Sequence, residues 1–332
     1  MPERDPRPFQ RVLVTGAAGF IGSTLVDTCL ARGADVVGLD NLDDYYDPAL
    51  KRANLAGAAD HPGFRLVEGD IRDAALVRRL VEDGGFDVVV HLAARAGVRP
   101  SIAQPGLYAD VNVQGTVSVL EALRARPGTR LVFASSSSVY GGLTRIPFAE
   151  DDEASRPVSP YAATKKAGEV LCHTWHHLYG LPVTVLRFFT AYGPRQRPDM
   201  AIAKFARLIR GGEPVPMFGD GDTARDYTYI GDIVDGVVRA MERTETYHVY
   251  NLGESRTTRL RDLVRLLGEA LGVEPRIDRH PMQPGDVEIT CADVTRACDE
   301  IGYAPSTPIE AGLERYAEWL ARTGPDVALA GR

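Results

Sequence analysis

The chain has 332 residues, of which 44% are hydrophobic and 25% are charged, and its formal net charge is −7. This is the composition of an ordinary soluble protein that can bury a large core, and an acidic chain without a Lys/Arg block does not favour nucleic acid as a partner. No apolar run approaches the ~20 residues that span a bilayer, and the polar start MPERDPRPFQR lacks the apolar region of a signal peptide.

Short β-branched runs alternate with longer helical stretches through the first half of the chain. The expected strands cover 11–16, 34–40, 64–70, 86–93, 130–136 and 182–188, and the expected helices cover 21–33, 73–83, 104–126 and 159–179. Strands that alternate with helices favour a parallel sheet with helices on both faces. The predicted fold class is therefore α/β, a Rossmann-type doubly wound sheet.

The composition changes after about residue 190, where Pro and Gly become frequent and the alternation of strands and helices ends. The run 249–253 is typical of a strand that returns to the first sheet, and 257–271 shows the leucine stripe of an amphipathic helix. We predict two domains, the second of them smaller and discontinuous α/β. The dinucleotide-binding domain would comprise 8–190 plus about 227–253, and the substrate-binding domain 191–226 plus about 254–324.

The stretch TGAAGFIG places Gly16, Gly19 and Gly22 three residues apart, between the first strand and the first helix. Such a turn brings backbone N–H groups close to a pyrophosphate at the helix N-terminus. Asp40 ends the second strand, where its carboxylate can accept from ribose hydroxyls and would repel a 2′-phosphate, so NAD is favoured. Asp70 follows the third strand and would either reach the adenine edge or cap a helix.

Hydroxyl and amine groups with a catalytic pattern follow in LVFASSSSVYG and YAATK. Ser136 ends a predicted strand, where doubly wound sheets bind ligands. Tyr161 and Lys165 are four residues apart on one predicted helix face. We expect Lys165 and a positively charged nicotinamide to favour the phenolate, so that Tyr161 takes a proton from a substrate hydroxyl that Ser136 also binds.

These motifs resemble the extended short-chain dehydrogenase/reductase superfamily over nearly the whole chain. Further stretches are similar to nucleotide-sugar epimerases, most of all to UDP-glucuronate 4-epimerases. They are DNLDDYYDPALKRANL (40–55), AGVRPS (96–101), YAATKKAGE, RFFTAYGP (187–194), RPDMAIAKF (197–205) and MFGDGDTARDYTYIGDI (217–233). The resemblance implies tightly bound NAD, a UDP-sugar substrate and a homodimer formed through helices like 104–126 and 159–179. The cysteines show no C-x-x-C spacing, so we expect reduced thiols in the cytoplasm; they are Cys29, Cys172, Cys291 and Cys298.

The resemblance also implies site residues beyond those argued above. For the cofactor they are Phe20, Ile21, Asn41, Ile71, Leu92, Ala93, Ala94 and Asn112. For the substrate they are Ser137, Ser138, Thr190, Arg197, Val215, Met217, Phe218, Arg225 and Asp286. Arg197 would clamp a uronate carboxylate, with Thr190 as a second donor, although a surface or diphosphate role is the alternative, and Arg225 would bind the diphosphate.

The implied reaction is the interconversion of UDP-glucuronate and UDP-galacturonate through transient oxidation at C4. UDP-glucose 4-epimerase and UDP-glucuronate decarboxylase are alternatives, and an NAD-sensing regulator is a non-enzymatic one. Ser137 and Ser138 stand where related dehydratases and decarboxylases carry an acid, which favours epimerisation. Pro100 and Gln196 depart from the family pattern near the sugar. No metal is expected, because His173, His176 and His177 have no nearby carboxylate or Cys pattern.

Overall fold

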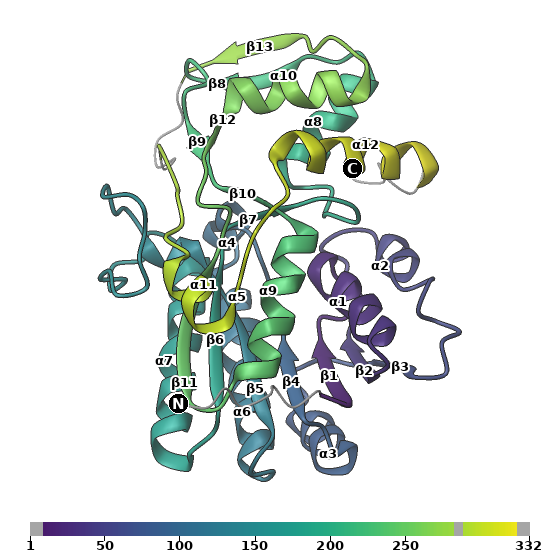
Figure 1. The fold of residues 1–332 in the computed structure, drawn as a ribbon, viewed down its shortest axis with the longest axis vertical. Coiled ribbons are helices and arrows are strands. Elements are labelled where there is room, and N and C mark those ends of the chain that lie inside the picture. Colours follow the sequence, from purple (N-terminus) through teal and green to yellow (C-terminus); the bar gives the residue numbers. More distant parts are fainter. Residues whose placement is uncertain (1–8, 282–287, 324–332) are drawn as a thin grey trace.

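The computed structural model describes residues 9–281 and 288–323. Its central sheet has seven parallel strands in the order β11-β6-β5-β4-β1-β2-β3 (Figure 1), which confirms the predicted parallel sheet. The strands are β1 (Arg11–Thr15), β2 (Asp35–Asp40), β3 (Phe64–Glu68), β4 (Val88–His91), β5 (Arg130–Ser136), β6 (Val183–Phe188) and β11 (Tyr247–Leu252). The strand expected near 249–253 does return to this sheet, in parallel register with β6. The strand order reverses between β1 and β4, and this reversal opens a crevice at their carboxyl ends.

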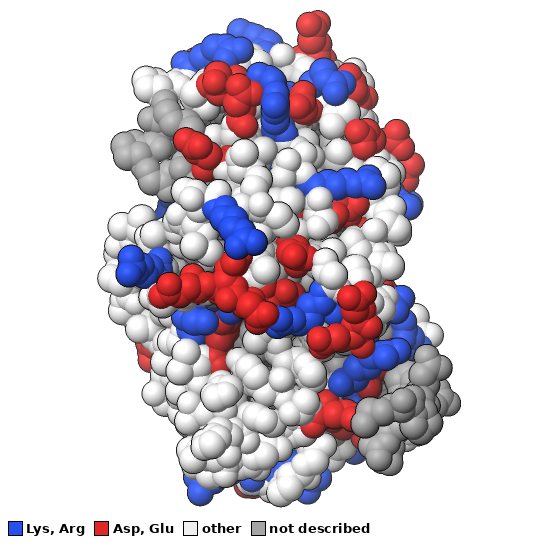
Figure 2. Space-filling model, turned by 60° about the vertical axis from the view of Figure 1, so that its left-hand side comes forward, with Lys and Arg blue, Asp and Glu red and all other residues white. Residues whose placement is uncertain are grey.

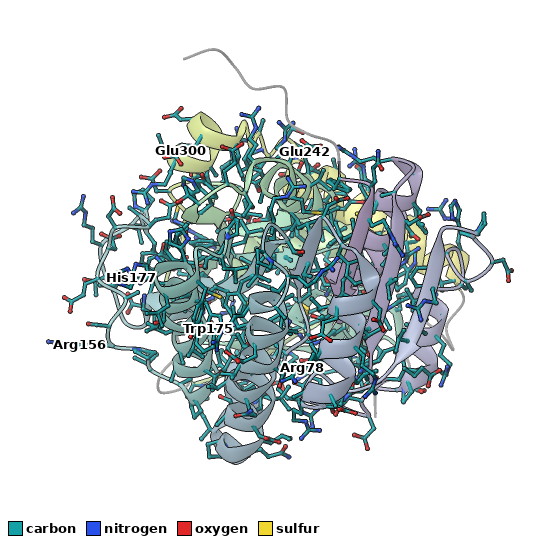
Figure 3. The ribbon with its side chains drawn as sticks, turned by 90° about the horizontal axis from the view of Figure 1, so that it is seen from below. Arg78, Arg156, Trp175, His177, Glu242 and Glu300 are labelled. Atoms are coloured by element: carbon teal, nitrogen blue, oxygen red, sulfur yellow. The ribbon has the colours of Figure 1, made fainter. Side chains whose placement is uncertain are left out.

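Both faces of the sheet are buried, which explains why its strands are continuous apolar runs. Along β1, Val12 and Val14 belong to one core and Leu13 belongs to the other. The first core lies under α1 (Phe20–Ala31), α9 (Ile230–Arg243) and α11 (Thr295–Ile301), and the second under α3 (Ala74–Gly84), α6 (Gly115–Arg124) and α7 (Pro160–Tyr179). Figure 3 shows Glu242 and Glu300 on one side of the sheet and Arg78 and Trp175 on the other.

Local sequence signals determine where α7, the helix that carries Tyr161, begins and ends. The Ser159 hydroxyl accepts a hydrogen bond from the Ala162 N–H at 3.1 Å, Pro160 occupies the first turn, and Gly180 ends the helix in the left-handed conformation. The helix expected at 104–126 is continuous from 105 to 124 but changes pitch. It comprises α5 (Pro105–Ala109), the π-helical segment η1 (Asp110–Gln114) and α6.

A separate core lies at the top of Figure 1. It is formed by α8 (Ala201–Arg210), β8 (Val215–Phe218), α10 (Leu260–Leu271) and α12 (Ile309–Thr323), and β13 (Ile277–His280) pairs with β8. The predicted leucine stripe holds, since Leu263 and Leu267 are fully buried. However, α10 begins three residues later than expected, because β12 (Thr258–Arg259) pairs with β9 (Ala224–Arg225).

Shorter elements connect these parts. Between the sheet and the upper core, β7 (Thr190–Tyr192) pairs in parallel with β10 (Tyr227–Tyr229). Short helices follow β2, β4 and β5, namely α2 (Pro48–Asn54), α4 (Val98–Ala103) and η2 (Ser137–Tyr140). Within 9–281 and 288–323, every helix is too short or too polar to cross a membrane.

Candidate active site

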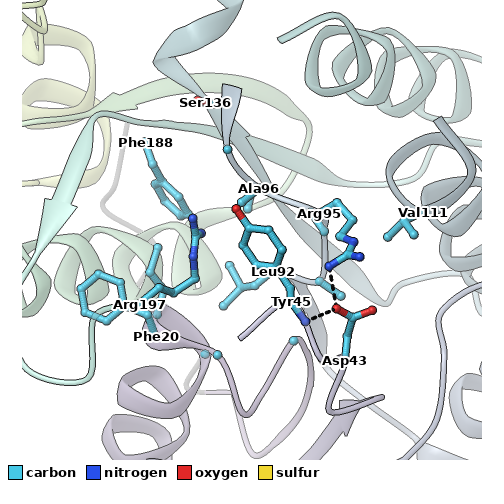
Figure 4. A pocket seen from close by; sticks show the side chains of 18 of the residues that line it. Phe20, Asp43, Tyr45, Leu92, Arg95, Ala96, Val111, Ser136, Phe188 and Arg197 are labelled. Carbon is cyan, nitrogen blue, oxygen red and sulfur yellow. Dashed lines mark hydrogen bonds and ion pairs between the residues drawn. The ribbon is translucent and has the colours of Figure 1, made fainter. Parts of the chain in front are cut away.

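A cavity of about 530 Å³ opens at the carboxyl ends of the central strands (Figure 4). It brings together most of the residues that the sequence predicts. The predicted cofactor residues that line it are Gly16, Gly19, Phe20, Ile21, Gly22, Asp40, Asn41, Asp70, Ile71, Leu92, Ala93, Ala94, Tyr161 and Lys165. The predicted substrate residues that line it are Ser136, Ser137, Ser138, Thr190 and Arg197. Asn112, Val215, Met217, Phe218 and Arg225 lie elsewhere, and Asp286 falls outside the described residues.

Close packing within the protein requires glycine at two positions of the glycine turn. Gly16 has a φ of +72°, and a Cβ there would lie 2.8 Å from the backbone N of Ala93. A Cβ at Gly22 would lie only 2.1 Å from the carbonyl oxygen of Gly16. Helix α1 begins at this turn with no side-chain cap and no acidic residue in its first turn. Its first N–H groups and the positive end of its dipole are therefore available to a diphosphate.

Asp40 is fixed in the cavity wall. Its Oδ2 accepts from the Ala18 N–H at 3.0 Å and its Oδ1 from the Leu42 N–H at 2.9 Å. Since each carboxylate oxygen has more than one lone pair, both retain acceptor capacity toward ribose hydroxyls.

Asp70 is held more tightly than the sequence suggests. Arg72 donates to both of its oxygens and lowers the pKa of this carboxyl to about 2, with a further hydrogen bond from Asn41. The cap of α3 is Asp73, so of the two roles considered for Asp70 the helix cap is wrong.

Tyr161 and Lys165 lie in the first two turns of α7 and face the cavity. Burial raises the pKa of the Tyr161 phenol, whereas a hydrogen bond with Ser136 and the positive charge of Arg197 lower it. Lys165 Nζ donates to the Ala134 carbonyl at 2.7 Å, and burial lowers the pKa of this amine to about 8. Burial is the largest of these effects, so the pKa of Tyr161 is raised overall in the protein alone, and the expected effect of Lys165 on Tyr161 stays a prediction.

A buried ion pair that we did not predict from the sequence holds α7, the helix of Tyr161 and Lys165, against the central sheet. Arg187 donates from Nε and Nη2 to the two carboxylate oxygens of Glu169, both at 2.9 Å, and Ser135 Oγ donates to the same carboxylate at 2.6 Å. The pair joins α7 to β5 and β6 one turn beyond Lys165. Its signals in the sequence are a lone arginine in the apolar run PVTVLRF and a glutamate four residues after Lys165.

Arg197 brings a cation to the same cavity. Its Nε and Nη2 donate to the two carboxylate oxygens of Asp199 at 2.9 and 2.8 Å. Figure 4 also shows Tyr45 and Arg95 beside it, which we did not single out from the sequence. The cavity thus combines a glycine turn at a helix N-terminus, the hydroxyl groups of Tyr161 and Ser136, and the cation of Arg197.

A family model described as "NAD dependent epimerase/dehydratase family" matches residues 12–253. The chain belongs to this family. As a member of the NAD dependent epimerase/dehydratase family it is an NAD-dependent enzyme, and the glycine turn at the uncapped start of α1 and the carboxylate of Asp40 fit that cofactor.

Individual members of the family resemble the chain along nearly its whole length. UDP-glucuronate 4-epimerase 3 of Arabidopsis thaliana is 45% identical over 327 residues, which cover 93% of this chain and 76% of the relative. The crystal structure of a Bacillus cereus UDP-glucuronic acid 4-epimerase in complex with UDP-glucuronic acid and NAD is 34% identical, covers 95% of this chain and 100% of its own, and has a TM-score of 0.88. A Thermotoga maritima UDP-glucose 4-epimerase solved with UDP-glucose is 32% identical, covers 95% and 99%, and has a TM-score of 0.87. The overall fold therefore does not distinguish these two sugars.

The other predicted site residues that the structure describes do not line the main cavity of this family member. Asn112 binds the backbone N–H and carbonyl of Arg95 at 2.7 and 3.0 Å, so it braces the cavity wall from outside. Val215 and Met217 are buried in the upper core, and Phe218 packs on His280. Arg225 Nη1 donates to the carbonyls of Ala224 and Glu288 at 2.9 and 3.2 Å.

The two departures from the family pattern, Pro100 and Gln196, do not line the main cavity. Gln196 is buried, its Oε1 accepts from the Gly193 N–H at 3.2 Å, and it lines a second cavity of about 160 Å³. Pro100 lies within α4. The rings of His173 and His176 pack against Tyr247.

Proposed function

We propose that this member of the family is a UDP-glucuronate 4-epimerase, which interconverts UDP-glucuronate and UDP-galacturonate. The observation that carries the proposal is one cavity that holds Tyr161 and Ser136 together with Arg197, beside a glycine turn suited to a dinucleotide. The 45% identity to an Arabidopsis thaliana UDP-glucuronate 4-epimerase supports the same substrate.

The cofactor half of the cavity would be formed by the residues of the glycine turn and by Asp40. The chemistry that bound NAD supplies is reversible hydride exchange with C4 of the sugar, which inverts C4 without net oxidation when re-reduction occurs on the opposite face. Gly16, Gly19 and Gly22 would admit the diphosphate to the start of α1. Asp40 would accept from the ribose hydroxyls and repel a 2′-phosphate.

Tyr161 would move the proton of this reaction. Its hydroxyl oxygen takes the proton from the C4 hydroxyl as C4 becomes a ketone, and it returns the proton when C4 is reduced again. Burial raises the pKa of this phenol and so disfavours the phenolate that accepts the proton. Ser136, Arg197 and a positively charged nicotinamide would all favour the phenolate, and Ser136 would also bind the sugar O4.

The substrate half would recognise a uronic acid through Arg197 and Thr190. A ketone at C4 makes the substrate carboxylate that of a β-keto acid, which loses CO2 when the bond to the carboxyl carbon aligns with the carbonyl π system. Arg197 would hold the carboxylate away from that alignment through paired hydrogen bonds. Ser137 and Ser138 would add no acid beside the ketone that could promote elimination.

The rest of the nucleotide sugar would lie toward the upper core. We assign residues 8–190 and about 227–253 to the NAD-binding domain, and 191–226 and about 254–324 to the nucleotide-sugar domain, as expected from the sequence. Arg225 is half-exposed on β9 and would bind the diphosphate. Val215, Met217 and Phe218 on β8 would support the uridine side from the core.

The proposal includes a cytoplasmic homodimer that buries the outer face of α7. Ile102 on α4 and Val170 on α7 expose 65% and 56% of their surface, and contiguous exposed apolar surface marks interaction sites. Figure 2 shows mostly uncharged surface over the lower left of the molecule, where α7 lies. The four cysteines are free thiols, in keeping with a reducing compartment.

Sedimentation of the wild type and of Val170→Glu tests the dimer, which the variant should dissociate.

Product analysis tests the reaction itself. The protein is incubated separately with UDP-glucuronate and UDP-glucose, and the sugars are separated and quantified. We expect UDP-galacturonate from the first, little UDP-pentose, and much slower conversion of the second. Rapid conversion of UDP-glucose with none of the uronate would make it a UDP-glucose 4-epimerase, and a UDP-pentose as main product would make it a decarboxylase.

A conservative variant tests the role of Tyr161. Tyr161→Phe removes only the hydroxyl oxygen, so we expect turnover to fall by at least about 10³-fold while the NAD content of the purified protein is unchanged. A variant that keeps its rate would show that another group accepts the proton.

A further inference from the structure

The ring of Tyr45 lies between two arginines at the wall of the main cavity (Figure 4). The Cζ atoms of Arg95 and Arg197 lie 5.1 and 5.5 Å from the ring centroid, within the range of cation–π attraction. Each guanidinium has its own carboxylate, since Arg95 Nη1 donates to Asp43 at 2.6 Å and Arg197 donates to Asp199. The arrangement is therefore two ion pairs that share one aromatic ring.

Tyr45 contacts Arg197 and the counterion of Arg197 at the same time. Its ring packs on the guanidinium, and its hydroxyl donates to Asp199 Oδ2 at 3.3 Å. Asp199 occupies only one edge of the guanidinium, the edge formed by Nε and Nη2. No described residue accepts a hydrogen bond from Nη1, so the end edge of Nη1 and Nη2 can still take a second carboxylate in a paired geometry.

The segment that carries Tyr45 is itself fixed. Asp43 Oδ1 accepts from the backbone N–H of Tyr45 at 2.8 Å as well as from Arg95, and Lys51 Nζ donates to the Asp43 carbonyl at 2.6 Å. This segment follows directly on Asp40 at the end of β2. These hydrogen bonds thus connect the expected ribose site at Asp40 to the Arg197 guanidinium, which would face the sugar.

We propose that Tyr45 and Asp199 are positioning residues for uronate recognition, which hold the Arg197 guanidinium with its end edge free for the carboxylate of the substrate. The inference rests on the proposed function, because it concerns the substrate that Arg197 selects. A long arginine side chain loses conformational freedom when it binds a carboxylate in a fixed plane, and this loss is smaller where the plane is already set. Tyr45 fixes the plane by its ring, and Asp199 fixes the rotation within that plane.

Variants at Tyr45 distinguish the contribution of its aromatic ring to substrate binding from the contributions of side-chain volume and of the hydroxyl group. Dissociation constants for UDP-glucuronate, UDP-glucose and UDP are measured by calorimetry in the Tyr161→Phe background, which prevents conversion. Tyr45→Leu retains bulk without a π face and should weaken UDP-glucuronate binding about tenfold, with UDP-glucose and UDP within about twofold of the parent. Tyr45→Phe retains the ring and should weaken the binding of UDP-glucuronate by no more than about threefold. The matched control is Tyr179→Leu, which removes a ring under Arg124 far from the cavity and should change nothing.

Asp199→Asn tests the second positioning residue in the same assay. We expect weaker binding of UDP-glucuronate alone, by about threefold to tenfold, because the amide can accept only one of the two arginine hydrogen bonds. Tighter binding would overturn the proposal for Asp199, since it would mean that this carboxylate competes with the substrate. If Tyr45→Leu changed the dissociation constants of all three ligands equally, or changed none of them, the proposal for Tyr45 would be overturned. Failure of the wild type to epimerise UDP-glucuronate would instead refute the proposed function.

Discussion

Glu169 and Arg187 form a doubly hydrogen-bonded ion pair with both N–O distances at 2.9 Å, and their side chains expose only 3% and 4% of their surface. Removal of one partner leaves an uncompensated charge in the interior, so we expect Glu169→Ala to lower the free energy of unfolding by about 3–5 kcal/mol in urea denaturation. Glu121→Ala, which breaks an exposed pair with Arg124, should cost less than about 0.5 kcal/mol.

A double variant shows whether the charge or the packing matters. If the cost of Glu169→Ala comes from the unpaired arginine, the combined change Glu169→Leu and Arg187→Met should destabilise the protein less than Glu169→Ala alone. Additive losses would contradict this account and assign the effect to packing.

The sheet and its main helices could be predicted because both faces of the sheet are buried, which gives apolar strand runs separated by amphipathic helices. The site could be predicted where backbone geometry demands a residue type, as at Gly16, or where a motif fixes a spacing, as for Tyr161 and Lys165. Arg187 and Tyr45 could not be placed, because their partners come from segments far apart in the chain. Val215 and Met217 are predicted as substrate-binding residues from the resemblance alone, and the alternation of β8 places their side chains in the upper core.

Gly16 offers a test of the dinucleotide turn with a matched glycine elsewhere. Gly16 and Gly33 have similar positive φ values of +72° and +80°, but no atom lies within 4 Å of a Cβ at Gly33, whereas a Cβ at Gly16 meets the Ala93 backbone at 2.8 Å. Gly33→Ala should therefore cost only the conformational strain, about 1 kcal/mol. Gly16→Ala should add about 1–3 kcal/mol for the clash and lower the NAD content of the purified protein, measured after denaturation. Equal stability and equal NAD content in the two variants would contradict the role of the turn.

His91 gives the protein a pH-dependent stability. It is 2% exposed, its two ring nitrogens contact Thr15 and Thr116, and burial lowers its pKa to about 3. The unfolded chain binds a proton at this histidine below its ordinary pKa of 6.5 while the folded chain does not, so stability falls as the pH falls through that value. Between about pH 7.5 and pH 5 the loss should be about 2 kcal/mol.

The contribution of His91 can be isolated by difference, because carboxyl groups titrate in the same range. The amide of His91→Asn does not titrate, so the unfolding free energy of this variant should depend less steeply on pH than that of the wild type between pH 5 and about pH 6.5. Parallel profiles would show that His91 does not stay neutral in the folded protein.

Arg197 has two effects on the proposed reaction that can be separated. Its charge lowers the pKa of Tyr161, so Arg197→Ala should lower kcat for any sugar at neutral pH. Its hydrogen bonds to a carboxylate concern only the uronate, so the dissociation constant of UDP-glucuronate should rise by about 10–100-fold and that of UDP-glucose by less than about threefold. A less constrained carboxylate should also increase CO2 release and the yield of UDP-pentose. Arg195→Ala is the control, because Arg195 pairs with Asp27 outside the main cavity. A similar loss of affinity for both sugars would show that Arg197 binds a part of the ligand that they share, such as the diphosphate.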